Sequence, residues 1–258
     1  MDQKKSDSFF DKVFDFVQKN KKTIVLIVLL SCLSVIVLNS FRQYFTNPTK
    51  KEILKGKRKK YKETVLSENP KVILIENFVN PLQAKHLMKI ADDIKKPSTI
   101  DTNGDPYTLA TNVRSSESAH LGKARDAIVK QIEDDACDYV GLETTYLEPM
   151  QVVVYEKGQK FNPHYDFFSP DTPDLPFRGN RNKTILVYLN DIKEEDGGAT
   201  VFPKIGLKYQ PKAGSALYFE NMNADGIDYN TLHAGEELKS DKYNKYAINI
   251  WFREKATW

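Results

Sequence analysis

From residue 145 to the C-terminus the sequence consists of short β-type runs, and this pattern restricts the possible folds more than any other feature. The runs are separated by Gly, Pro and Asp turns and cover residues 145–155, 183–190, 199–202, 215–219 and 245–252. Upstream, residues 72–75 read as a buried strand, and residues 81–94 and 116–139 have helical periodicity. Helices followed by many short strands predict an α+β domain with scaffold helices and a double-stranded β-helix, that is, a jelly-roll or cupin-like barrel.

An uncharged segment of nineteen residues, 23–41, precedes this domain and is flanked by Lys21, Lys22 and Arg42. Because about 20 apolar residues cross a bilayer as a helix, we expect one transmembrane helix here. A cleaved signal peptide is the alternative, but the apolar core is long for one and no clear small-x-small cleavage site follows. The expected organisation is an N-terminal tail (1–22) with roughly helical spacing of its apolar residues, the transmembrane helix (23–41), a basic linker (42–68) and a folded domain (69–258).

The net charge of +3 is concentrated in one segment. Residues 50–62 hold eight Lys and Arg against one Glu, so the rest of the chain carries a net charge of −4. A solvated stalk and a segment that binds anionic lipid headgroups both fit this composition. Nucleic acid is not expected as a partner, because neither aromatic interleaving nor a recognition motif accompanies the charge. The two cysteines, Cys32 and Cys137, exclude a disulfide framework within the soluble part.

A His-x-Asp pair, His164 and Asp166, follows the apolar run that begins at Gln151. Residues two apart in a strand share a face, so these two side chains can bind one ion together. A third ligand must come from a distant strand, and His233 in the run Thr-Leu-His-Ala-Gly offers one in a sequence with four histidines. Two histidines and one carboxylate on one side of a metal, with other positions open, are typical of non-haem Fe(II) oxygenases.

The surrounding motifs resemble those of the prolyl 4-hydroxylase family of Fe(II)/2-oxoglutarate dioxygenases, from about Asn69 to the C-terminus. The matching blocks occur in the family's order and read MQVVVYEKGQKFNPHYDFF, NRNKTILVYLND, GGATVFP, PKAGSALYF, and LHAGE followed by KYAINIWFRE. A lone His-x-Asp is weak evidence because it arises often by chance, whereas five blocks in order are specific. With the apolar segment 23–41, the chain is similar to the single-pass membrane members of plants, algae and large DNA viruses.

The resemblance implies roles for the matching residues. His164, Asp166 and His233 would hold Fe(II) and leave positions open for 2-oxoglutarate and O2. A lysine after the second histidine binds the far carboxylate of 2-oxoglutarate in this family, and the match on Lys-Tyr-x-x-x-x-Trp assigns it to Lys245. Lys245 follows His233 by twelve residues, a longer spacing than is usual in the family, and Lys242 is its rival. We favour Lys245 because apolar residues alternate with it in a predicted strand, whereas Lys242 lies in a polar loop.

Further matches concern the co-substrate and the peptide. Tyr155 and Tyr188 match positions near 2-oxoglutarate, where their phenols would donate to its carboxylates; a core aromatic is the alternative for each. Arg181 and Trp251 match an arginine on the substrate side and an aromatic at the lip of the site, a pair suited to a polyproline II peptide. Arg114 resembles the arginine of the family's Arg-Thr-Ser block and is expected on a loop that covers the substrate.

The expected reaction is hydroxylation of C4 of peptidyl proline by O2 and 2-oxoglutarate, which releases succinate and CO2. The resemblance implies ascorbate as the reductant that rescues oxidised iron. The alternatives are a dioxygenase acting on another residue or protein target, and a catalytically dead peptide-binding barrel at a membrane. The Lys distribution around residues 23–41 weakly places the domain in the cytosol, whereas the resemblance implies the lumen of the endoplasmic reticulum or Golgi, which we favour.

Overall fold

The computed structural model describes residues 9–21, 61–102, 105–109, 112–170, 172–173 and 175–256, which fall in two compact units, Met1–Lys57 and Arg58–Trp258. The first unit contains α1 (Phe9–Lys19), which carries exposed apolar side chains such as Phe14 and Phe16. No helix among the described residues is long and apolar enough to cross a membrane. The segment 23–41, for which we expect a transmembrane helix, lies outside the described residues.

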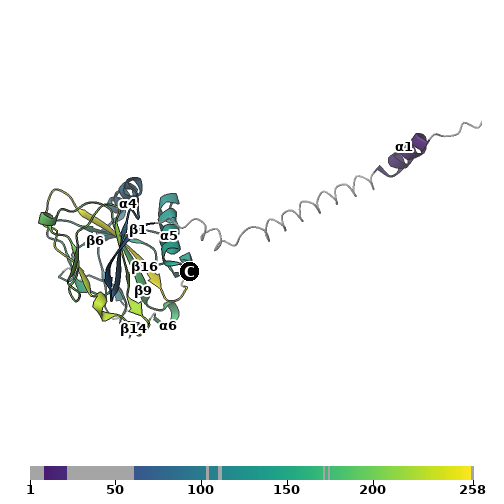
Figure 1. Cartoon of the computed structure of the whole chain (residues 1–258). Coiled ribbons are helices and arrows are strands. Elements are labelled where there is room, and N and C mark those ends of the chain that lie inside the picture. Colours follow the sequence, from purple (N-terminus) through teal and green to yellow (C-terminus); the bar gives the residue numbers. More distant parts are fainter. Residues whose placement is uncertain are drawn as a thin grey trace, which may run out of the picture. The chain divides into compact units, whose positions relative to one another are not determined.

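The second unit is built on two antiparallel sheets that pack face to face (Figure 1). The larger sheet has the order β1 (Lys62–Glu68), β2 (Lys71–Glu76), β12 (Ala216–Glu220), β9 (Arg181–Tyr188), β16 (Lys245–Arg253), β7 (Gln151–Tyr155), β6 (Glu117–His120), β3 (Lys96–Pro97). The smaller sheet has the order β11 (Leu207–Tyr209), β10 (Thr200–Phe202), β15 (His233–Gly235), β8 (Phe161–His164). Together they form a barrel of the jelly-roll type, as the succession of short strands predicts.

Short elements connect these strands. Two ribbons pair β4 (Ile100–Thr102) with β5 (Asp105–Thr108) and β13 (Met222–Asn223) with β14 (Gly226–Ile227). Single turns of helix form α6 (Leu175–Arg178), η1 (Thr144–Tyr146), η2 (Glu194–Asp196) and η3 (Tyr229–Thr231). The last of these lies directly before β15.

Strand β16 decides which side chains face the barrel interior, because alternate residues of a strand point to opposite faces. Ile248 and Ile250 pack in the core between the large sheet and the helices. Lys245, Ala247 and Asn249 lie on the other face and line a pocket inside the barrel. Most residues of the strand are buried, on both of its faces. Its two edges are paired with β7 and β9.

Two helices, α4 (Pro81–Ile94) and α5 (Ala127–Val140), lie side by side against the outer face of the large sheet (Figure 1). Helix α4 begins at a capping box in which Asn80 and Gln83 bond each other's backbone N–H groups. Helix α5 begins at Asp126, whose carboxylate accepts from two N–H groups of the first turn, and ends at Gly141 in the left-handed conformation (φ 74°). The helix expected over residues 116–139 is therefore shorter at its start: Glu117–His120 is a strand that pairs with β7.

The domain also begins earlier than expected. Residues 62–68, assigned to the basic linker from their charge, form β1 and pair with β2. The strand is at the edge of the sheet and mostly exposed, and Leu66 packs against the core between the sheets. A charged edge strand is common because charge blocks edge-to-edge pairing, but its composition resembles that of a solvated linker.

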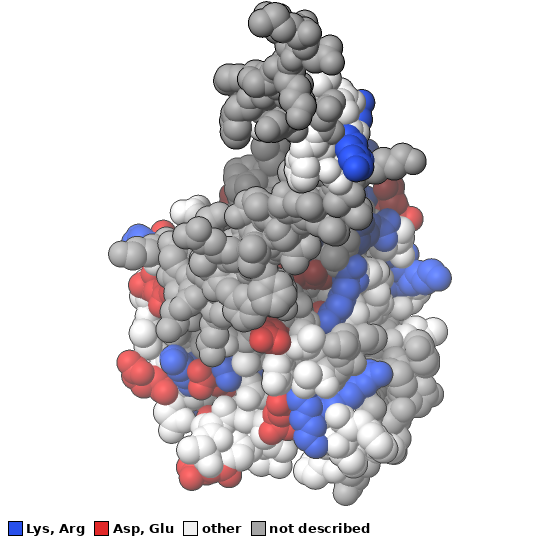
Figure 2. Space-filling view, turned by 90° about the vertical axis from the view of Figure 1, so that its right-hand side faces the viewer, with Lys and Arg blue, Asp and Glu red and all other residues white. Residues whose placement is uncertain are grey.

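The charged surface is mixed in sign. Figure 2 shows one face of the molecule, on which Lys and Arg side chains lie between Asp and Glu side chains over the described residues.

Candidate iron and 2-oxoglutarate site

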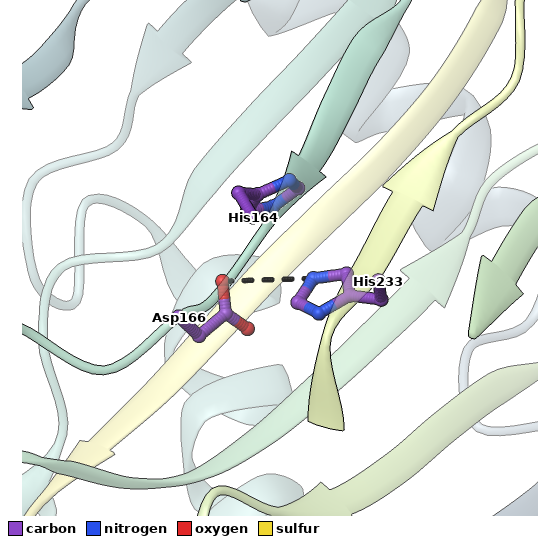
Figure 3. Close-up of side chains that lie close together, drawn as sticks. All are labelled: His164, Asp166 and His233. Atoms are coloured by element: carbon purple, nitrogen blue, oxygen red, sulfur yellow. Dashed lines mark ion pairs between the residues drawn. The ribbon is translucent and has the colours of Figure 1, made fainter. Parts of the chain in front are cut away.

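The three predicted metal ligands converge at one end of the small sheet. His164 ends β8 and His233 begins β15, and the two residues are direct partners across these strands. Asp166 follows β8 by two residues, so its side chain returns to the same side (Figure 3). One ligand atom from each residue lies within 4.8 Å of the others.

Both histidines make hydrogen bonds that leave Nε2 to bind a metal. His164 Nδ1 lies 2.8 Å from the carbonyl oxygen of Asn162, and His233 Nδ1 lies 2.9 Å from that of Thr231. Because a carbonyl oxygen only accepts, each Nδ1 donates a proton, and Nε2 is the nitrogen left to bind a metal. Burial and, to a smaller extent, the neighbouring His233 lower the pKa of His164 to about 3, so His164 is neutral at physiological pH.

Asp166 is held by one of its two oxygens. Its Oδ2 accepts a hydrogen bond from Thr184 Oγ1 at 2.7 Å, and Thr184 accepts one from Asn221 Nδ2 at 2.9 Å. Its Oδ1 points toward His233 Nε2 at 3.8 Å (Figure 3). Burial alone raises the pKa of Asp166, but the two histidines, Arg181 and the Thr184 hydroxyl outweigh it and hold the pKa below its usual value. The carboxylate is therefore charged, with Oδ1 directed to the centre.

Two imidazole nitrogens and one carboxylate oxygen on one side fit Fe(II). The ring of Phe161 stacks on the His164 imidazole, with 3.4 Å between ring centroids. This contact fixes the His164 ring in addition to its bond to Asn162.

A pocket adjoins the triad on the inner side of the barrel. It is lined by Val153, Tyr155, Phe161, His164, Leu186, Thr200, His233, Ala234, Gly235, Lys245, Ala247 and Asn249. Its walls are mostly apolar with a few polar groups, the arrangement expected of a small-molecule site.

Lys245 is the cation of this pocket. It is 3% exposed, lies opposite Tyr155 across β16 and β7, and its Nζ is 5.0 Å from the Tyr155 ring centroid. Among the described residues Lys245 Nζ has no hydrogen-bond or ion-pair partner, and burial lowers the pKa of its ammonium to about 8, although Glu236 opposes the shift. Lys242, the rival in sequence, is exposed. The structure thus brings Lys245, and not Lys242, to the pocket.

The two tyrosines differ in position. Tyr155 lines the pocket and lies next to Gly235. Tyr188 does not line the pocket: its phenol donates to Thr200 Oγ1 at 2.8 Å, and its ring packs in the core between the sheets. Tyr188 therefore fits the alternative of a core aromatic with a satisfied hydroxyl, and Thr200, its partner, lines the pocket.

Arg181 and Trp251 lie together, as the resemblance implies. The Arg181 guanidinium is 3.6 Å from the Trp251 ring centroid and 4.5 Å from that of Phe168. Two of its nitrogens bind Glu148 at 2.8 and 2.9 Å, and Arg253 also donates to Glu148. The two arginines hold the pKa of Glu148 below its usual value despite burial. Sequence reasoning missed Glu148 and Arg253, because neither lies in a matched motif position whose role was known.

Arg114, which we expect on a loop that covers the substrate, has a buried side chain. It is 6% exposed, and its guanidinium lies 4.7 Å from the Phe161 ring centroid. It donates to the hydroxyls of Ser116 and Ser118, to the Gln151 amide oxygen and to the Thr99 carbonyl oxygen. Arg114 packs on Phe161, and Phe161 stacks on the His164 imidazole. These contacts hold the His164 ring in place.

The fold and the site define the class of protein. Residues 150–253 match the sequence model of the 2OG-Fe(II) oxygenase superfamily. A viral collagen prolyl hydroxylase from Paramecium Bursaria Chlorella virus-1, solved as a 2OG complex, has a similar fold: the TM-score is 0.54 at 24% identity, over 70% of this chain and 94% of that one. The chain is a 2OG-Fe(II) oxygenase in fold and in metal ligands.

Plant relatives narrow the family. Probable prolyl 4-hydroxylase 10 of Arabidopsis thaliana is 32% identical over 209 residues, which are 73% of this chain and 71% of that protein. Probable prolyl 4-hydroxylase 3 of the same plant is 33% identical over 216 residues, 76% of this chain and 74% of that protein. The chain belongs to the prolyl 4-hydroxylase family.

Proposed function

We propose that this protein hydroxylates C4 of proline residues in a polypeptide, consuming O2 and 2-oxoglutarate and releasing succinate and CO2. The observation that carries the proposal is the triad of His164, Asp166 and His233 beside a pocket. Among the residues that line this pocket, Lys245 is the one cationic side chain, and it is buried. The names of the plant relatives and of the viral structure support proline as the target.

Different residues of the chain bind the metal and 2-oxoglutarate. Fe(II) with 2-oxoglutarate and O2 supplies the oxidising power, and the protein supplies binding, orientation and exclusion of water. His164 and His233 would bind one metal ion through Nε2, and Asp166 would bind it through Oδ1. Lys245 binds the far carboxylate of 2-oxoglutarate at the inner end of the pocket, with the Tyr155 phenol beside it.

The peptide side is formed by Arg181 and Trp251. The Trp251 indole is 7% exposed, and among the described residues its Nε1 has no hydrogen-bond acceptor. A buried donor without an acceptor is costly, so a carbonyl oxygen of a bound peptide is a suitable partner. Arg181 is fixed on the face of the Trp251 ring by Glu148, which orients the indole for this contact.

The test is succinate release with and without a proline-rich peptide, together with detection of hydroxyproline. His164→Ala, Asp166→Ala and His233→Ala should each abolish turnover while the protein stays folded, because the triad has no spare ligand. Asp166→Gly should retain some iron with an exogenous anion but not hydroxylate. A variant with near wild-type turnover and stoichiometric iron would remove that residue from the triad.

Two alternatives give other results in the same assay. Succinate release that depends on a peptide without proline would indicate another target residue. Peptide binding without succinate release would indicate a catalytically dead barrel. We also propose ascorbate as the reductant of oxidised iron, which rests on the family resemblance and predicts that turnover decays faster without it.

We further propose that residues 23–41 anchor the protein in a membrane and that the domain faces the lumen of the endoplasmic reticulum or Golgi. The nineteen uncharged residues support the anchor, and the resemblance to the single-pass enzymes supports the lumenal side. Protease protection of the domain in sealed microsomes tests the side, and extraction with detergent but not with carbonate tests the anchor.

A further inference from the structure

An aromatic cluster lies beside the iron site and has no place in the reaction described so far. It consists of Tyr165, Phe167 and Tyr229, with Lys204 at its edge; we call it the rim cluster. Tyr165 and Phe167 stack with 4.6 Å between ring centroids, and Tyr229 meets both edge-on at 5.7 and 5.5 Å. Lys204 Nζ lies 5.7 Å from the Tyr165 centroid and 6.0 Å from the Tyr229 centroid.

The rim cluster is tied to the segments that hold the metal ligands. Tyr165 stands between His164 and Asp166 in the chain, so the backbone that carries the two ligands also carries this ring. Tyr229 begins η3, whose last residue, Thr231, accepts the hydrogen bond from His233 Nδ1. Both halves of the cluster are therefore positioned by the same backbone that positions the iron ligands.

The cluster is available at the surface. Tyr229 is 53% exposed, Tyr165 and Phe167 are partly exposed, and Lys204 is exposed. None of the four belongs to the two hydrophobic cores. Lys204 has no carboxylate partner among the residues that the structure describes, so its charge near the rings is available to a ligand.

We infer that the rim cluster is a docking subsite for a proline-rich segment of the substrate that flanks the proline at the iron, an inference that rests on the proposed function. A polyproline II helix presents rigid pyrrolidine rings that pack on aromatic faces, while its backbone carbonyls stay free. Lys204 adds attraction for these carbonyl oxygens and for an acidic residue of the same segment. The iron site fixes the target residue, and the rim cluster selects chains that continue beyond it as proline-rich sequence.

The experiment uses the full-length chain and two peptides with the same target proline. One peptide spans only this proline and its neighbours, and the other continues on both sides with proline-rich sequence that carries an acidic residue. The readouts are the ratio of KM for the short peptide to KM for the long peptide, kcat for both, and direct binding of the long peptide by calorimetry. Wild-type protein should favour the long peptide.

Tyr229→Ala should reduce this KM ratio about three- to tenfold, the range expected from one aromatic contact, with little change in kcat. Lys204→Ala should reduce it less, and Tyr229→Phe should keep it, because the ring remains. Leu82→Ala is the matched control, since Leu82 is an exposed apolar residue (78%) on α4. It should leave the ratio at the wild-type value.

Equal KM ratios in wild type and Tyr229→Ala would overturn the inference. So would an effect of Tyr229→Ala on self-association or on binding to phosphatidylcholine vesicles in place of an effect on peptide. If no peptide is hydroxylated, the proposed function fails, and calorimetry still decides the subsite: long-peptide binding lost in Tyr229→Ala and kept in Tyr229→Phe supports it, and no difference refutes it.

Discussion

The structure supports the assignment of Lys245 as the 2-oxoglutarate ligand more strongly than the sequence does. Its spacing from His233 is irregular for the family, whereas its place in the pocket is defined by β16 and its pairing with Tyr155. An ammonium without a partner in a buried pocket is unfavourable until an anion neutralises it. The lysine and the far carboxylate of 2-oxoglutarate should therefore depend on each other.

Lys245→Ala should weaken 2-oxoglutarate binding by ~3–5 kcal/mol, the cost of breaking a buried ion pair, which is a factor of hundreds or more in affinity. Lys242→Ala should have little effect, because Lys242 is exposed. Lys245→Arg should rescue binding in part, since the guanidinium restores charge but not shape. The measurement is a 2-oxoglutarate titration at fixed iron and peptide. A large shift in Lys242→Ala with normal Lys245→Ala would show that the assignment is wrong.

The pH dependence follows from the same lysine. Because the pKa of Lys245 is lowered to about 8 in the free protein, the ammonium that binds the carboxylate is lost above that pH. The dissociation constant of 2-oxoglutarate should be flat below pH 8 and rise about tenfold per pH unit above it. Lys245→Arg should remove the rise, because arginine stays protonated. A flat wild-type profile to pH 10 would contradict the lowered pKa.

The stability of the ligand-free domain should change in the opposite direction. The unfolded chain binds the Lys245 proton more tightly than the folded protein, so the buried ammonium costs stability below pH 8. This cost falls, and the free energy of unfolding rises, from pH 8 toward the ordinary lysine pKa. Saturating 2-oxoglutarate should remove this trend, since it keeps the lysine protonated in the folded state.

At the scale of elements, Glu148 joins strands that are distant in sequence. It precedes β7 and binds Arg181 at the start of β9 and Arg253 at the end of β16. The arrangement fixes the corner of the sheet on which Trp251 lies. Its carboxylate has a lowered pKa, so this contribution is present above the ordinary glutamate pKa and is lost as the pH falls.

Glu148→Gln should lower the free energy of unfolding by ~3–5 kcal/mol, because two largely buried guanidinium groups lose their counter-charge. The measurement is urea unfolding at neutral pH. Glu195→Gln is the control, since Glu195 forms an exposed ion pair with Lys193 and should have little effect. Similar unfolding midpoints for the two variants would mean that the Glu148 cluster is not a stabilising element.

At the scale of the whole molecule, the boundary of the domain is open to test. A protein that begins at Arg58 retains all of β1 and should be soluble without detergent and turn over as the full chain does. A protein that begins at Asn69 lacks β1 and should lose about 2–4 kcal/mol of stability through the lost burial of Leu66 and of Tyr61, which stacks on Phe78. Equal unfolding midpoints would show that β1 adds nothing, and an Arg58 protein that aggregates would show that the domain needs the N-terminal unit.

Local sequence determined the elements and most of the iron site. Period-two alternation, turn residues and helix caps depend on neighbours in the chain, so the helix Pro81–Ile94 and the strand Lys245–Arg253 were predicted nearly as they are. The run expected over 145–155 is a strand only from Gln151, after the short helix Thr144–Tyr146. His164 and Asp166 share a face for the same local reason. The strand Lys62–Glu68 was missed because its charged composition is that of a linker, and only pairing with β2 makes it a strand.

The tertiary structure decided what depends on distant contacts. Pairing of β8 with β15 brings His233 opposite His164, and pairing of β16 with β7 turns Lys245 into the pocket. Burial of Arg114 and the ion pairs of Glu148 with Arg181 likewise join segments far apart in the chain. A sequence pattern indicates which face of a strand a residue occupies. The register between strands decides which side chains lie opposite one another, and ion pairing and burial follow from that register.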